Sequence, residues 1–198
     1  MGTKFEIKET KKGERIMYQI VVLREPNDSI LNQLMELRRK AFPSGWNEYA
    51  DISYYAESII DPKNLVVVLL DGENLLGFLL ATPHNVARED LIVEDPLMEE
   101  KENCFYVETI EMSPELTGSL AGGRSFFRMM QVFVSEAAKM GINYFSMHAR
   151  ADSGLSDVIK RYFKHNENIV RRIEKWPWNI DGPVDYIAGK CRRDIITG

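Results

Sequence analysis

The sequence predicts an α+β fold in which a mixed, mostly antiparallel sheet is flanked by helices. The apolar runs 65–70 and 75–81 are separated by a short Asp-Gly-Glu-Asn turn, which predicts an antiparallel hairpin. Farther on, a strand-like run at 104–112 leads through a helical pattern into another strand-like run at 142–149, which predicts a parallel crossover. Antiparallel hairpins around one parallel crossover are typical of α+β folds and not of doubly wound parallel sheets.

The segments before this hairpin predict one strand and two helices. Residues 1–16 are polar and predict a tail or an edge segment, and the β-rich run 18–23 predicts the first strand. The triplet Asn27-Asp28-Ser29 offers an N-cap for a helix that Pro43 ends, and a second helical pattern runs from about 47 to 60. The apolar stripes that mark these helices are Ile30, Leu34, Leu37 and Ala41 in the first, and Ile52, Tyr55, Ala56 and Ile59 in the second.

The segments after the hairpin predict a long loop, two helices and three strands. Residues 82–103 are polar and acidic, and we expect a solvated loop with at most one helical turn near Pro96. The apolar residues of the run 104–112 change parity near Glu108, which predicts a bulge or bend there. The other expected elements are a helix over 124–140 ended by Gly141, a helix capped by Asp152 or Ser153, and strands at 169–175 and 184–191.

Composition and charge narrow the class of protein. The 198 residues predict a polar extension over 1–16 and a single domain over 17–198, and the net charge of −5 argues against a general nucleic-acid binder. Cys104 and Cys191 are too few for a disulfide framework or a cysteine zinc site, so we expect free thiols and no metal. The N-terminal residues lack an apolar signal-peptide core, and the apolar stretches are too short to span a bilayer. We therefore expect a cytoplasmic protein without a membrane partner.

The junction between the strand run 104–112 and the following helix carries the most chemical information. Small residues fill the connection between Ser113 and Gly123, and glycines let a backbone approach a ligand closely. Free N–H groups and the positive dipole end at the start of a helix favour a phosphate or pyrophosphate, and Arg124 would add positive charge. The junction is not a P-loop, because no Gly-Lys-Ser/Thr follows. An ordinary turn that ends in a glycine cap is the alternative.

This junction, together with the element order, resembles the GNAT superfamily of acyl-CoA-dependent N-acetyltransferases. The resemblance covers roughly residues 19–190 in architecture and is sharp at 104–127 and 142–163. The family's phosphate loop reads Arg/Gln-x-x-Gly-x-Gly/Ala, and the best match here is Gly118-x-x-Ala121-x-Gly123. Gly118 stands where the family has Arg or Gln, and Ala121 replaces its first glycine.

The resemblance implies a sheet with splayed central parallel strands and acetyl-CoA as cosubstrate. In the family, the pantetheine arm of coenzyme A enters the gap between these strands. Backbone groups of Ile110, Glu111 and Met112 would pair with the arm, and Ser153 would also touch it. The residues that would hold the pyrophosphate are Gly118, Ala121, Gly122, Gly123 and Arg124.

Amine acylation needs a base for the ammonium proton and an acid for the leaving thiolate. Tyr162 stands where the family has a thiolate-protonating tyrosine, although it also belongs to an apolar helix stripe. Glu108, at the expected bend, is the first candidate for the base, and a salt bridge is its structural alternative. Glu111 competes for the same role from three residues farther on. His148 is the third candidate, and a lone histidine is more often structural.

These observations predict an N-acyltransferase that moves an acetyl group from coenzyme A to a primary amine by direct attack in a ternary complex. The acceptor is a small-molecule amine or a protein amino group, and an aromatic patch of Trp46, Tyr49, Tyr54 and Tyr55 lies where the family recognises it. The alternatives are a non-catalytic acyl-CoA-binding module and an acyltransferase that uses longer acyl chains or acyl carrier protein. Edge strands near the C-terminus would allow a homodimer.

Overall fold

The computed structural model describes residues 4–11, 14–41, 51–117, 120–162, 169–176 and 182–191. The chain forms two compact units. Unit 1 comprises residues 1–80 and 109–133, and unit 2 comprises residues 81–108 and 134–198. Mostly antiparallel strands and flanking helices make up both units, so the predicted α+β class with a mixed sheet is confirmed.

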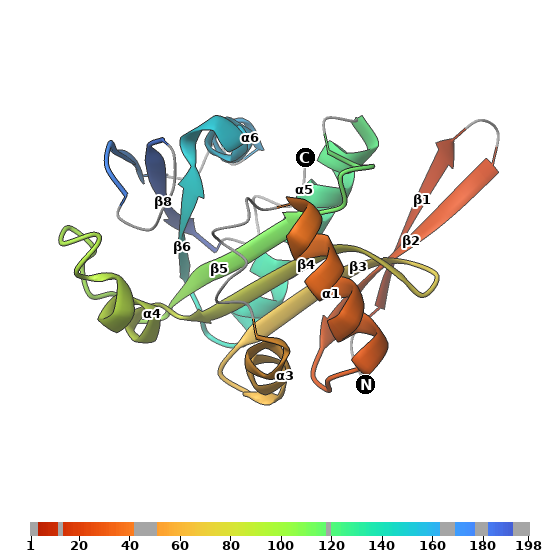
Figure 1. Ribbon diagram of the computed structural model, residues 1–198, viewed down its shortest axis with the longest axis horizontal. Coiled ribbons are helices and arrows are strands. Elements are labelled where there is room, and N and C mark those ends of the chain that lie inside the picture. Colours follow the sequence, from red (N-terminus) through yellow and green to blue (C-terminus); the bar gives the residue numbers. More distant parts are fainter. Residues whose placement is uncertain are drawn as a thin grey trace. The chain divides into compact units, whose positions relative to one another are not determined.

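Unit 1 contains four successive strands that pair in chain order (Figure 1). They are β1 (Lys4–Lys11), β2 (Glu14–Leu23), β3 (Leu65–Asp71) and β4 (Asn74–Pro83), whose last three residues belong to unit 2. β1 runs antiparallel to β2 along its whole length, and β2 runs antiparallel to β3. The sequence predicted either a polar tail or an edge segment over residues 1–16. The described residues of this range form strand, so the edge segment is the expectation that the structure supports.

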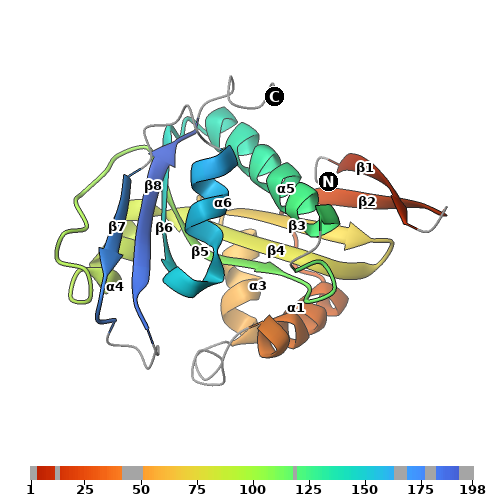
Figure 2. The same cartoon turned by 90° about the horizontal axis from the view of Figure 1, so that it is seen from above.

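Two helices cover one face of these strands (Figure 2). α1 (Asp28–Ala41) begins as expected, because the Asn27 side chain accepts a hydrogen bond of 3.1 Å from the Ile30 N–H. α3 (Ile52–Ile60) is capped by Asp51 and begins later than expected; residues 42–50, which include Trp46 and Tyr49, lie outside the described residues. The apolar stripes pack onto β3 and β4 in a core of Leu31, Leu34, Leu37, Tyr55, Ile59, Val66, Val68, Leu75, Phe78 and Leu80.

The opposite face of β4 packs against the helix α5 (Leu120–Lys139), whose residues up to Phe133 belong to unit 1. A Cβ atom on Gly77 would lie 2.9 Å from the Met112 sulfur and 3.0 Å from the Met129 sulfur. The absence of a side chain at Gly77 therefore lets β4 approach the end of β5 (Cys104–Met112) and α5. The Ser113 N–H also donates a hydrogen bond of 2.8 Å to the Leu76 carbonyl, next to Gly77.

Unit 2 contains the first part of β5 and three further strands, in the order β5-β6-β8-β7. β6 (Tyr144–Arg150) runs parallel to β5 and antiparallel to β8 (Val184–Lys190), which in turn pairs with β7 (Ile169–Ile173). The expected crossover and C-terminal hairpin are both present. Gly141 takes the positive φ of a helix C′ residue after α5, as expected.

The expected loop over 82–103 is wrong in part, because its first third is the helix α4 (His84–Leu91). The buried face of α4 consists of His84, Ala87 and Leu91, at helical spacing. A histidine in this stripe hid the helical period, because a count of apolar residues does not include it. The helix begins after Pro83 without a side-chain cap, so no N-cap signal marked it.

The expected start of α5 at Arg124 is also wrong, since the helix begins at Leu120. Ala121, Gly122 and Gly123 therefore lie in its first turn and not in a loop that precedes it. Adjacent glycines are tolerated here because the first turn of a helix lacks four of its backbone hydrogen bonds and tolerates poor helix formers.

Candidate functional site

Strands β5 and β6 pair only over their first residues. Their parallel register joins Cys104 to Tyr144, Phe105 to Phe145 and Tyr106 to Ser146, and it ends there among the described residues. β6 nevertheless continues to Arg150, with every residue paired to β8. Two parallel neighbours thus stop pairing after three residues of each strand, as the splay expected from the family resemblance requires. Backbone groups beyond this point are candidates for pairing with an extended ligand.

The residues of β5 beyond Tyr106 alternate in burial without a break. Thr109 and Glu111 are buried, whereas Glu108, Ile110 and Met112 are half-buried. The sequence predicted a bulge near Glu108 because the apolar residues change parity there. In the structure the parity changes because polar residues, Thr109 and Glu111, occupy the buried positions at the end of the strand, while the alternation of burial itself continues. The alternation places Glu108 and Glu111 on opposite faces of the strand.

The start of α5 gives its two glycines different roles. A Cβ atom on Gly122 would lie 1.8 Å from the Leu116 carbonyl oxygen, so this glycine is needed for the close approach of helix and preceding turn. A Cβ atom on Gly123 would meet nothing within 4 Å, and Arg124 is exposed. Gly123 and Arg124 are therefore the members of the predicted phosphate loop that are accessible at the helix start. Gly118 lies outside the described residues, as does the side chain of Ala121.

Glu111 forms a buried ion pair with Arg38 of α1, inside unit 1. The Arg38 guanidinium nitrogen Nη1 lies 2.5 Å from Glu111 Oε1 and also donates a hydrogen bond of 3.3 Å to Thr109. The Glu111 side chain is fully buried, and no described residue donates a hydrogen bond to its other oxygen, Oε2. Burial raises the pKa of Glu111 to about 7, although Arg38 opposes the shift. A carboxylate with one oxygen that lacks a donor and a pKa near neutrality can accept a proton at neutral pH.

Glu108 is placed differently, in unit 2. Its Oε1 accepts a hydrogen bond of 2.7 Å from the Thr82 hydroxyl, and the residue is half-buried. The expected role of Glu108 as a base is compatible with this exposure.

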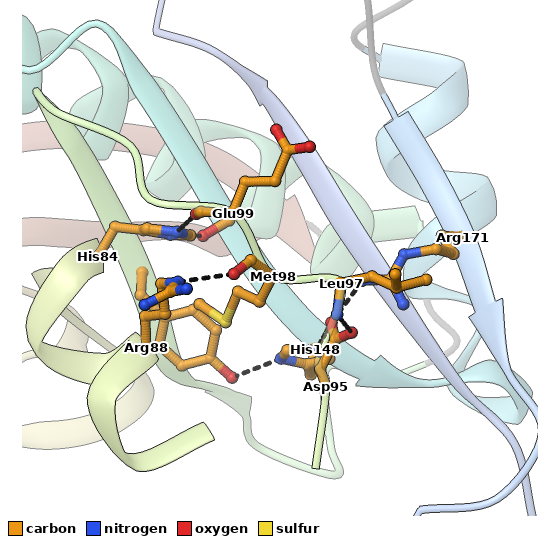
Figure 3. A network of polar contacts seen from close by, with 10 residues as sticks. His84, Arg88, Asp95, Leu97, Met98, Glu99, His148 and Arg171 are labelled. Atoms are coloured by element: carbon orange, nitrogen blue, oxygen red, sulfur yellow. Dashed lines mark hydrogen bonds and ion pairs between the residues drawn. The ribbon is translucent and has the colours of Figure 1, made fainter. Parts of the chain in front are cut away.

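His148 lies in a buried network of unit 2 (Figure 3). Its Nε2 lies 3.0 Å from Asp95 Oδ2 and its Nδ1 lies 3.0 Å from the Tyr106 hydroxyl, so both ring nitrogens are engaged. Arg171 donates to the same Asp95 oxygen. Burial lowers the pKa of His148, which favours a neutral ring that donates to Asp95 and accepts from Tyr106. Because both ring nitrogens have hydrogen-bond partners inside the protein, this arrangement is typical of a structural histidine rather than of a base that faces the substrate.

The remaining predicted residues lie near α6 (Leu155–Tyr162). The Ser153 hydroxyl caps this helix, because it accepts a hydrogen bond of 3.2 Å from the Leu155 N–H and donates one of 2.6 Å to the Arg150 carbonyl. Tyr162 is the last residue of α6, and its side chain lies outside the described part of the chain. Of the aromatic patch, Tyr55 is a core residue and Tyr54 is exposed.

Sequence reasoning missed Arg38 and Asp95 as buried partners. Arg38 is four residues after Leu34, in the apolar phase of α1, and a charged residue in that phase was the available signal. Asp95 stood among the acidic residues of an expected solvated loop, yet its side chain is 1% exposed. No local pattern distinguishes it from its exposed neighbours, because its partners are 53 and 76 residues away.

Among the described residues, no His, Cys, Asp and Glu side chains form a group that could hold a metal ion. None of the helices in the described ranges combines the length and apolarity needed to cross a bilayer. Cys104 and Cys191 are both buried and free, and burial raises their thiol pKa values to about 11 and about 12. Neither thiol is suited to act as a nucleophile at neutral pH.

Comparison with known proteins relates this fold to a group of acetyltransferases. No protein-family model and no curated protein sequence matches the chain. Among solved structures, aminoglycoside 6′-acetyltransferase type Ii matches with a TM-score of 0.60 at 15% identity, covering 87% of this chain and 97% of that chain. The ribosomal-protein-S18-alanine N-acetyltransferase of Escherichia coli matches with a TM-score of 0.58 at 13% identity, over 88% and 92% of the two chains.

A third match contains coenzyme A. The PaiA N-acetyltransferase of Thermoplasma acidophilum, in complex with coenzyme A, has a TM-score of 0.56 at 13% identity and covers 87% of this chain and 98% of its own. Identities this low establish the fold and leave residue roles to be argued from this chain. The chain therefore has the GNAT fold, the architecture that its sequence resemblance implied.

Proposed function

We propose that this protein is an acyl-CoA-dependent N-acyltransferase that moves an acetyl group to a primary amine. The observation that carries the proposal is the early end of pairing between β5 and β6 at Tyr106 and Ser146. A parallel pair buried in a sheet normally continues its ladder, because an unpaired backbone N–H or C=O is costly away from water. An extended thioester arm with amide groups, such as pantetheine, would satisfy the backbone groups that this separation leaves.

The cosubstrate would be held on β5 and at the start of α5. Backbone groups of Ile110, Glu111 and Met112 would pair with the pantetheine amides, as the resemblance implies. The pyrophosphate would lie at the first turn of α5, where unpaired N–H groups, the helix dipole and the exposed Arg124 favour an anion. Ser153 uses its hydroxyl for the α6 cap, so its contact to the pantetheine would come through the remaining lone pair.

The chemistry would be direct attack in a ternary complex. The amine nitrogen forms a bond to the thioester carbonyl carbon and loses its second proton to solvent, the carbon–sulfur bond breaks, and coenzyme A leaves as a thiolate. We assign the base that first takes the ammonium proton to Glu111, because no described residue donates to its buried Oε2 and its pKa is raised to about 7. Glu108 is the second candidate, and Tyr162 is the proposed acid that protonates the thiolate.

An assay of turnover distinguishes the proposed N-acetyltransferase from the longer-chain acyltransferase and from the non-catalytic binding module. We expect the purified chain to release free thiol from acetyl-CoA in the presence of a panel of small amines and peptides with free amino groups. Release from longer acyl-CoA or from acyl carrier protein, with none from acetyl-CoA, would indicate the longer-chain acyltransferase. Tight coenzyme A binding without turnover on any acceptor would indicate the binding module, which the Gly118 and Ala121 departures from the family loop favour.

The phosphate site has a matched test in the same turn of α5. Gly123→Asp places bulk and negative charge at an open position, so coenzyme A should bind at least about tenfold more weakly. Gly123→Ala fills open space and should leave the affinity and the fold nearly unchanged. Calorimetry of both variants checks the proposal, and equal affinity in a folded Gly123→Asp variant would exclude this turn as the pyrophosphate site.

A further inference from the structure

The Arg38 guanidinium is held by side chains of two other elements of unit 1. Its Nη1 donates to Glu111 Oε1 and to the Thr109 hydroxyl on the buried face of β5, and its Cζ lies 5.4 Å from the centre of the Tyr55 ring in α3. That ring is buried and packs in edge-to-face geometry against Phe78 of β4, with the ring centres 5.7 Å apart. A planar cation bound by a strand and an aromatic ring has little freedom to move, so it fixes the Glu111 carboxylate through Oε1.

The two oxygens of Glu111 differ from those of a carboxylate in a purely structural ion pair. Asp95 in unit 2 shows the structural case, because each of its oxygens accepts at least one hydrogen bond. At Glu111, Oε1 receives the guanidinium, whereas no described residue donates to the buried Oε2. A buried oxygen without a donor costs free energy, so its retention beside a bound Oε1 indicates a second task for this carboxylate.

Arg38 also supplies the positive charge at the Glu111 carboxylate. Of the charged groups in the described ranges, Arg38 of α1 is the one that acts on Glu111, and the titratable Tyr55 of α3 faces the same guanidinium. Burial favours the protonated carboxyl, which has no capacity to take up a further proton, and the guanidinium opposes it by lowering the pKa of Glu111. Because a guanidinium stays protonated in proteins, its charge is present at every pH at which the protein would work.

We propose, on the basis of the acyl transfer proposed above, that Arg38 is a positioning residue that holds Glu111 by Oε1, leaves Oε2 for the proton of the acceptor amine, and opposes protonation of the carboxylate before the amine arrives. The proton would pass from the ammonium nitrogen to Oε2. That transfer leaves a neutral carboxyl beside the guanidinium and a neutral amine with a free electron pair. No bond of Arg38 is made or broken, so Arg38 acts only through Glu111.

The pH dependence of turnover tests this role. Arg38→Met removes the charge and keeps a long side chain in the core, so the rise of kcat with pH should move to higher pH by at least about one pH unit. Turnover should fall at least about fivefold at pH 7 and recover as the pH rises, because less of the base is ionised at pH 7. KM for acetyl-CoA should stay unchanged. A merely structural role would instead lower turnover to the same extent at every pH.

Three variants serve as controls for charge and folding. Arg38→Lys keeps a positive charge, so its pH profile should lie nearer to that of the parent than the profile of Arg38→Met. Arg24→Met removes an arginine of unit 1 that donates to the Asn64 carbonyl at 2.8 Å, and it should leave the profile in place although the net charge changes equally. Thermal unfolding shows which variants fold. If Arg38→Met does not, Arg38→Gln takes its place with the same expected shift, because it also lacks the charge.

A titration of Glu111 reads the same effect without turnover. In protein labelled with ¹³C at the glutamate carboxyl carbons, the signal that Glu111→Gln lacks belongs to Glu111, and its midpoint should move to higher pH in Arg38→Met. A midpoint or a pH profile that stays in place, or an equal loss of turnover at every pH, would overturn the role of Arg38 and leave the acyl transfer standing. A parent protein without turnover on any acceptor would overturn the acyl transfer itself.

Discussion

Glu111 in unit 1 and Asp95 in unit 2 are both carboxylates removed from water, yet they differ in their partners. Glu111 has one cation, Arg38, and an oxygen to which no described residue donates, whereas Asp95 binds His148, Arg171 and the Leu97 N–H. Burial opposes ionisation in both, but the pKa of Glu111 is raised and that of Asp95 is lowered. The donors and charges of His148 and Arg171 outweigh the effect of burial on Asp95 and hold it ionised at neutral pH, whereas Arg38 alone does not outweigh burial of Glu111.

The largest expected effect is a loss of turnover on replacing Glu111, the carboxylate to which we assign the role of base. Glu111→Gln should lower turnover by about 10²-fold or more, because a positioned base contributes that much to a proton transfer. Coenzyme A affinity should change little, since the strand backbone is retained. The pH–rate profile of the parent should show an apparent pKa near 7 that the variant lacks. If Glu108→Gln removes this limb and Glu111→Gln keeps it, the base is Glu108.

The next effect concerns stability. Asp95→Asn removes the charge that both His148 and Arg171 face, and we expect a loss of about 3 kcal/mol in the free energy of unfolding, as for other broken buried pairs. Denaturant unfolding of parent and variant measures it. Glu111→Gln is the matched change in the other unit. It should lower the free energy of unfolding by less, because Oε2 of Glu111 has no donor among the described residues and so loses no hydrogen bond. Equal losses would show that the donor count does not distinguish the two sites.

The pH dependence of stability should have opposite signs in the two regions. The folded pKa of Glu111 is raised from 4.5 to about 7, so its contribution is fully present below pH 4.5 and is lost as the pH rises through about 7. Relative to Glu111→Gln, the parent should therefore lose about 3 kcal/mol over that range. Unfolding measured at a series of pH values checks the slope; a slope of the other sign would mean that Arg38 holds Glu111 ionised.

The histidine of unit 2 responds in the other direction and more weakly. The folded pKa of His148 is lowered from 6.5, so the stability that its neutral ring contributes is present above pH 6.5 and is lost as the pH falls below it. His84, whose pKa burial also lowers, adds a loss of the same sign. The protection factors of β6 amides, which are corrected for the intrinsic exchange rate, should therefore fall in mild acid, and His148→Gln should reduce that fall. Unchanged protection factors would show that the ring is not kept neutral.

Arg171→Gln should have the smallest effect. Its side chain is 27% exposed, so solvent screens its charge, and we expect a loss of about 1 kcal/mol in the free energy of unfolding. Arg38→Gln is the comparison, because that side chain is 9% exposed. Thermal unfolding of both variants should rank Arg38 above Arg171. The reverse order would show that exposure is a poor guide to the worth of these pairs.

Local patterns predicted most of the fold. The bounds of β5 came directly from the strand-like run 104–112, and Asn27 marked the start of α1. The pattern failed where a polar residue occupies a buried position, as His84 does in α4. The same limit applies to the site: Glu111 was recognisable on its strand, but its pairing with Arg38 joins residues 73 apart in sequence. Such pairs form only when elements that are distant in the sequence pack together. The spacing of residues within one element carries no information about that packing.

The distribution of the two cysteines has a consequence for experiments on either unit. Cys104 and Cys191 are the chain's two thiols; both are buried, and both belong to unit 2. An alkylating reagent can reach them only when unit 2 opens, so the labelling rate of the unmodified protein reports that opening. Mass spectrometry of a timed alkylation thus follows one unit in the presence of the other, without an introduced probe.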